Sequence, residues 1–157
     1  MTYPAAPRKV YTDSQENYDG SCAVLALQAA TGCAYNDARA YAKTKLGFRP
    51  KKGTPNYTLM NMDKMSCFGH TATKIEREDR PKTLNQACKA YSEGSYFVMV
   101  KGHAVAIKDG KLIDNGYEID PADKQLFRGR RRVIFAIKMT PNARKNYGTG
   151  VQLTLAF

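Results

Sequence analysis

The chain of 157 residues lacks the features that mark membrane and secreted proteins. It has no apolar run of the roughly 20 residues that a membrane-spanning helix needs. Residues 1–9, MTYPAAPRK, also lack the apolar stretch of a signal peptide. From these absences we expect a protein that does not associate with membranes and is located in the cytoplasm.

Paired cysteine spacing is also absent. The four cysteines stand at Cys22, Cys33, Cys67 and Cys88, and in a reducing compartment we expect them to be free thiols. Cys67 and His70 have the spacing of half a zinc site, but no second pair of this kind accompanies them. We therefore expect no metal ion and no other cofactor.

Negative charge is scarce, because 14 Asp and Glu face 25 Lys and Arg, for a net charge of +11. This excess favours an anionic neighbour, which could be nucleic acid, an acidic protein or an anionic cell-wall polymer. Lys and Arg concentrate in 49–52 and 128–132, and both segments could equally be a solvated surface. The candidate anion-binding residues are Arg128, Arg130, Arg131 and Arg132. No known nucleic-acid-binding signature accompanies them, so that role rests on charge alone.

The first chemically suggestive stretch surrounds Cys22. Asp19-Gly20 is typical of a turn, Ser21 is a good helix N-cap, and small apolar residues follow. This pattern predicts a buried helix over 22–31 that Gly32 ends. At a helix N-terminus, free backbone N–H groups and the helix dipole favour a thiolate and can stabilise an oxyanion. The alternative is that this cysteine is a small core residue.

The second suggestive stretch reads as a hairpin. His103 begins one strand, Asp109-Gly110 forms the turn, and Asp114 ends the next strand. A turn at this position sets residue 105 opposite residue 114, so His103 and Asp114 lie at the same open end. A cysteine, a histidine and an aspartate supply a nucleophile, a base and a group that orients the base. A structural histidine and an ordinary Asp-Asn-Gly turn are the alternatives.

The remaining pattern predicts helices first and antiparallel strands later, which gives an α+β fold in one domain over 1–157. Residues 1–16 form an N-terminal arm and 140–157 a C-terminal extension with a strand at 151–157. Asn36 is expected to cap a helix over 37–46, and Thr83 and Gln86 form a capping box for a helix that ends near Glu93. Strands are expected at 71–75, 95–101 and 133–139, and a loop at 117–125.

The order of cysteine, histidine and aspartate resembles that of the papain-like cysteine peptidase superfamily. Asp19-Gly20-Ser21-Cys22 resembles the Asp-Gly-Asn-Cys opening of ovarian-tumour-type deubiquitinases. Residues 102–106, GHAVA, resemble the Gly-His-x-Val-x strand of bacteriocin-processing peptidases. The resemblance covers roughly residues 15–138 through short motifs. It implies a papain-like fold in which N-terminal helices pack on a C-terminal antiparallel sheet.

The resemblance also implies roles for individual residues. Cys22 would be the nucleophile, His103 the general base and Asp114 the orienting residue, with Asn115 as its rival because papain-like enzymes use either residue type.

The oxyanion donor of papain is a glutamine a few residues before the cysteine. The equivalent offset here falls on Glu16, which cannot donate when ionised. Its neighbours Gln15 and Asn17 are therefore the candidate donors, beside the backbone N–H of Cys22.

These observations predict a cysteine hydrolase, either a peptidase or an isopeptidase, that cleaves an amide bond of a protein or peptide through a thioester. Two alternatives remain open. One is a non-catalytic basic module on the same scaffold that contacts nucleic acid or an acidic protein, and the other is a peptidoglycan amidase or endopeptidase. Size and charge suit a phage or mobile-element protein that acts in the host cytoplasm or the virion. The sequence leaves the oligomeric state open.

Overall fold

The structure is a computed structural model that describes residues 3–10, 22–49, 52–54, 62 and 66–142. The candidate oxyanion donors Gln15 and Asn17, the predicted strand 151–157 and most of the C-terminal extension lie outside these residues. The described helices are α1 Cys22–Thr31, α2 Tyr35–Lys45, α4 Leu84–Ala90 and α5 Lys124–Phe127, with a short 3-10 turn, η2, at Arg77–Asp79. None of them is long and apolar enough to cross a membrane.

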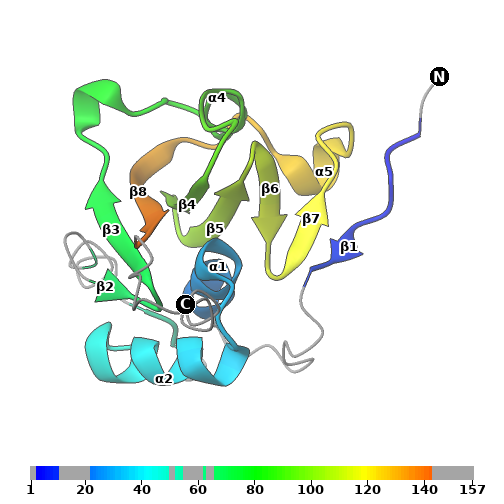
Figure 1. Cartoon of the computed structure of the whole chain (residues 1–157). Helices are drawn as coiled ribbons and strands as arrows, with labels where there is room; N and C mark the ends of the chain where they lie inside the picture. Colours follow the sequence, from blue (N-terminus) through cyan, green and yellow to red (C-terminus); the bar gives the residue numbers. More distant parts are fainter. Residues whose placement is uncertain (1–2, 11–21, 50–51, 55–61, 63–65, 143–157) are drawn as a thin grey trace, which may run out of the picture.

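The strands form a single antiparallel sheet, as Figure 1 shows. They are β1 Arg8–Lys9, β2 Ser66–Cys67, β3 His70–Lys74, β4 Ser95–Val100, β5 His103–Lys108, β6 Lys111–Asp114, β7 Tyr117–Ile119 and β8 Val133–Pro141. Their order across the sheet is β1-β7-β6-β5-β4-β8-β3-β2. The predicted α+β class and antiparallel sheet are thus confirmed.

Helices cover both faces of this sheet. Successive side chains of a strand point to opposite faces, so Phe97 and Met99 of β4 pack with α1 and α2, whereas Val98 and Val100 pack with α4. Both faces of β4 are therefore buried, in agreement with its continuous apolar sequence. The sequence predicted helices on the sheet but did not distinguish these two faces.

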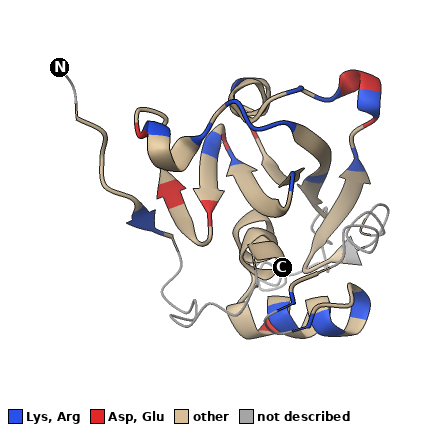
Figure 2. Ribbon diagram, turned by 180° about the vertical axis from the view of Figure 1, so that it is seen from behind, with Lys and Arg blue, Asp and Glu red and all other residues tan. Residues whose placement is uncertain are grey.

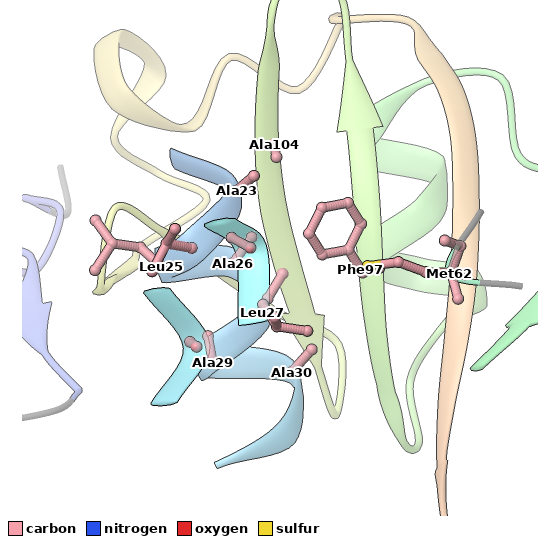
Figure 3. Close-up of a cluster of buried hydrophobic side chains, with 14 of the residues drawn as sticks. Ala23, Leu25, Ala26, Leu27, Ala29, Ala30, Met62, Phe97 and Ala104 are labelled. Carbon is pink, nitrogen blue, oxygen red and sulfur yellow. The ribbon is translucent and has the colours of Figure 1, made fainter. Parts of the chain in front are cut away.

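Close packing of α1 against β5 sets the position of the first helix. Every residue from Ala23 to Ala30 is buried, and four of these eight residues are alanine. Ala104 and Ala106 of β5 belong to the same cluster, and Figure 3 shows Ala23 beside Ala104. Because neither surface carries a long side chain there, the helix axis can approach the strand closely. The predicted helix and its glycine end are confirmed, since Gly32 has φ +78°.

The second helix differs from the prediction at its start. It begins at Tyr35, and Ala34 occupies the N-cap without a side-chain hydrogen bond, so Asn36 is not the cap. Tyr35, Ala38 and Ala42 form its buried stripe. Burial of the Tyr35 ring in the first turn outweighs the weak preference for a polar cap, which is worth about 1 kcal/mol.

The Thr83–Gln86 capping box of α4 is present with both of its hydrogen bonds. The helix nevertheless ends at Ala90, before the predicted end at Glu93. Tyr91 leaves the helix and stacks its ring on Tyr96 of β4, with ring centroids 3.8 Å apart. Packing against the sheet therefore decides where this helix ends.

The region 117–125 is not the predicted loop. Tyr117–Ile119 form β7, which pairs with β6 on one side and with β1 on the other. The short helix α5 follows, and the Asp123 side chain caps it by accepting a hydrogen bond from the backbone N–H of Leu126. The N-terminal arm contains an edge strand, β1, at Arg8–Lys9, just before Val10-Tyr11, where the sequence pattern favours a short edge strand.

We predict that Ala26→Leu destabilises the protein by about 1–3 kcal/mol, because Ala26 is buried and a longer side chain there would displace its neighbours. The same substitution at the exposed helical residue Ala40 is the matched control, with an expected change below about 0.5 kcal/mol. Urea unfolding of both variants measures the difference. Equal effects of the two substitutions would contradict the close packing described for α1.

Candidate active site

Cys22 and His103 lie close together, at the end where helix α1 and strand β5 both begin. Cys22 is the first residue of α1 and His103 is the first residue of β5. The two elements pack together, and Ala23 lies beside Ala104 where both begin (Figure 3). Cys22 and His103 immediately precede these two alanines, so they lie at the same end of the two elements. The His103 side chain forms a hydrogen bond with Cys22.

The same imidazole also binds Asp114. Nε2 of His103 and Oδ1 of Asp114 are 2.5 Å apart. An ionised carboxylate can only accept hydrogen bonds, so Nε2–H is the donor. This leaves Nδ1 as the ring nitrogen for Cys22. The ring of His103 therefore bridges the thiol and the carboxylate.

The β5–β6 hairpin has the predicted register. Ala106 pairs with Ile113 and Ile107 pairs with Leu112, with the turn at Asp109-Gly110. Continued by one step, this register sets residue 105 opposite Asp114, so that Asp114 and His103 lie at the open end of the hairpin. The sequence thus predicted this juxtaposition correctly from the length of the turn.

The environment of His103 favours its protonated form. The pKa of the imidazole is raised from 6.5 to about 9, first by the hydrogen bond to Asp114 and then by the hydrogen bond to Cys22. Partial burial of the ring opposes this rise but does not outweigh it. The side chains of His103 and Asp114 are 23% and 16% exposed, so solvent screens their attraction only in part. At neutral pH His103 is therefore an imidazolium.

Arg131 is a second partner of Asp114, which the sequence did not reveal. Its Nη2 lies 3.7 Å from Oδ2 of Asp114, and its side chain is only 18% exposed. The guanidinium also donates to the backbone carbonyls of Phe127 and Arg128, each at 3.4 Å. Asp114 is thus held through one oxygen by His103 and through the other by Arg131.

The sheet itself brings the basic segment 128–132 to this end. Val100 of β4 pairs with His103 on one side and with Val133 of β8 on the other. The residues that precede Val133 therefore lie at the same sheet edge as the start of β5. This proximity could be predicted only by knowing that β8 pairs with β4, which lies more than thirty residues earlier in the chain.

Backbone contacts with α4 fix the basic segment in place. The N–H of Leu84 donates to the carbonyl of Arg131, and the N–H of Asn85 donates to that of Gly129. A Cβ atom at position 129 would lie 3.0 Å from Cβ of Asn85, a tight contact, so this approach favours glycine. The arginines on either side are thereby held beside His103 and Asp114.

A cavity of about 670 Å³ opens beside the His103–Asp114 pair. Its lining combines this pair with basic residues from the β4–β5 turn and the basic segment. The other lining residues are Lys101, Gln125, Leu126, Arg128, Arg131 and Arg132. Three of the four arginines predicted to bind anions therefore line one cavity, and the exposed Arg130 lines a neighbouring one.

Asn115, the alternative orienting residue, is placed differently. It is exposed and lies in the β6–β7 turn with φ +51°, a conformation that asparagine tolerates better than most residues. The side chain that His103 binds at Nε2 is that of Asp114. The geometry therefore brings Asp114, and not the neighbouring amide, to the imidazole.

The other cysteines have different surroundings. Cys67 and Cys88 are buried, and burial raises the pKa of each thiol to about 11. Cys33 is partly buried against the core. Within the described ranges, His, Cys, Asp and Glu side chains form no group of three that could hold a metal ion.

Comparison of the chain with family models, with curated proteins and with solved structures found no match.

We predict that His103 makes protein stability depend on pH above pH 6.5. A pKa raised from 6.5 to about 9 stabilises the folded state fully below pH 6.5, and this contribution is lost as the pH rises through 9. The difference in thermal unfolding midpoint between the unmodified protein and His103→Gln should therefore be largest near pH 6 and shrink by pH 10.

His70→Gln is the matched control for this measurement. Nδ1 of His70 donates to the backbone carbonyl of Phe68, at 3.0 Å, and not to a carboxylate. The part of the pH dependence that is specific to the His103–Asp114 pair is the difference between the two variants. A constant difference for His103→Gln would contradict the interaction with Asp114.

Proposed function

We propose that the protein is a papain-like cysteine hydrolase that cleaves an amide bond, as a peptidase or an isopeptidase. One observation carries this proposal: the imidazole of His103 forms hydrogen bonds with both Cys22 and Asp114. Cys22 is the nucleophile, His103 is the general acid and base, and Asp114 is the orienting residue. This arrangement of three residue types is the one that nucleophilic acyl transfer requires.

The resting site is a thiolate–imidazolium pair. The raised pKa of His103 means that its ring holds a proton at neutral pH. The source of that proton is the thiol of Cys22, whose place at the start of α1 favours the thiolate. Asp114 stabilises the resulting positive charge on the ring and fixes its orientation.

In the first half-reaction the Cys22 thiolate attacks the carbonyl carbon and the carbonyl oxygen becomes an oxyanion. The backbone N–H of Cys22 stabilises this oxyanion, together with a side-chain amide, for which Gln15 and Asn17, the neighbours of the position that the resemblance indicates, are the candidates. The imidazolium of His103 then protonates the leaving nitrogen. The C–N bond breaks, an amine departs, and the acyl group remains on Cys22 as a thioester.

In the second half-reaction neutral His103 accepts a proton from water, and the hydroxide attacks the thioester carbonyl. The C–S bond breaks and the carboxylic acid product leaves. Cys22 returns as a thiolate and His103 returns as an imidazolium. Each cycle therefore consumes one water molecule and needs no cofactor.

Competitive alkylation across pH, with mass spectrometry of each cysteine, tests this proposal. We predict that Cys22 reacts fastest and that its reactive form persists well below the ordinary thiol pKa of about 8.5. Cys67 and Cys88 serve as internal controls, because burial raises their pKa to about 11. His103→Ala should abolish the advantage of Cys22.

Two further variants separate the rival orienting residues by the same measurement. Asp114→Asn removes the charge that holds the proton on His103, so the pH dependence of Cys22 alkylation should change. Asn115→Gly retains a residue that tolerates positive φ and should leave the profile unchanged. If Cys22 is inert in the folded protein, the hydrolase proposal fails.

A further inference from the structure

Two further cavities adjoin the one beside His103. The second, of about 770 Å³, shares Arg128 and Arg131 with the first and adds Lys124 and Arg130. The third, of about 520 Å³, shares Arg132 with the first and adds Arg77, Arg80 and Lys82. The shared arginines show that both cavities adjoin the first, and we call the combined lining of the three the basic track.

The charge of the basic track is strongly positive. Lys and Arg line all three of these cavities, whereas their described carboxylates are Asp114 and Glu78. Asp114 already binds His103 and Arg131, so it does not neutralise the remaining arginines. Figure 2 shows Lys and Arg positions at α5 and along the segment that leads into β8, and both basic and acidic positions around η2. A ligand that fits this track carries several negative charges along its length.

The shape of the track favours a flexible chain over a single small anion. The first cavity, beside the His103–Asp114 pair, lies between the other two: one adjoins it toward α5 and the N-terminal end of α4, and the other adjoins it toward the η2 turn. The backbone hydrogen bonds between α4 and segment 128–132 hold the middle of this path in one conformation. Successive anionic groups can therefore meet preformed positions.

The lining also distinguishes between classes of anionic chain. Proteins that bind single-stranded nucleic acid combine positive charge with exposed aromatic rings on which bases stack. Phe127 is the described aromatic residue in the lining, and it is buried. Arginine guanidinium groups bind carboxylates through paired hydrogen bonds, and this binding needs no exposed aromatic ring.

From these observations we infer that the basic track binds an extended acidic segment of the polypeptide substrate. The inference rests on the proposed amide hydrolysis for the choice of a polypeptide. Asp and Glu side chains of the substrate pair with the arginines of the track, and the first cavity brings the bound chain to the His103–Asp114 pair. The track thereby selects substrates with clustered negative charge near the cleaved bond.

Fluorescence anisotropy of a labelled peptide of repeated Glu-Gly units tests this inference. The full chain carries Cys22→Ala, so that binding is measured without cleavage. We expect saturable binding that weakens as salt is added, and no binding of the uncharged Gln-Gly peptide. Arg130→Gln with Arg132→Gln should weaken binding roughly tenfold, as the loss of two charge pairs at a surface would.

Lys43→Gln with Lys45→Gln is the matched control, because it removes the same charge from exposed positions on α2. It should weaken binding less than about twofold, since these residues act on the peptide only through long-range electrostatic attraction, which salt screens. Arg77→Gln with Lys82→Gln, both exposed in the third cavity, provides a second test of the track. It should also weaken binding more than the control does.

Two results would overturn the inference. Equal weakening by the track and control variants would show that net charge, and not the track, binds the peptide. Tighter binding of an oligothymidine with the same number of charges would show that the track is a nucleic-acid site. Neither result affects the expected alkylation of Cys22. Conversely, if the alkylation test failed, a measured peptide-binding site would still stand. The hydrolase proposal and the peptide-binding inference can therefore fail independently.

Discussion

The close approach of α1 to β5 is the constraint on which the site depends. Alanines on both elements leave no side chain long enough to separate them, as Ala23 and Ala104 illustrate. Because the helix and the strand begin at the same end, the residue before each alanine, Cys22 and His103, is brought within hydrogen-bonding reach. A larger residue in this contact would move the thiol away from the imidazole without altering either side chain.

Strand pairing completes the site from distant parts of the chain. One register, through Val100, sets the start of β5 beside the segment that enters β8. The same end of the sheet therefore holds a cysteine from the first helix, a histidine and an aspartate from a hairpin, and Arg131 from a segment near residue 130. Residues with complementary charge meet here because antiparallel pairing aligns strand ends.

Local signals in the sequence predicted the parts of this arrangement that depend on neighbouring residues. Turn chemistry at Asp109-Gly110 sets the hairpin register, and the Thr83–Gln86 capping box starts α4. Features that depend on tertiary packing were not predictable in this way. The burial of Tyr35 moves the start of α2, and the pairing of β8 with β4 brings Arg131 to Asp114.

His103 carries a proton at neutral pH because it lies between Cys22 and Asp114. The most direct measurement is an NMR titration of the His103 imidazole in the full chain, with Cys22→Ala and Asp114→Asn measured beside it. We expect a midpoint of about 9 in the unmodified protein and a lower midpoint in each variant. A midpoint near 6.5, unchanged by either substitution, would contradict this expectation.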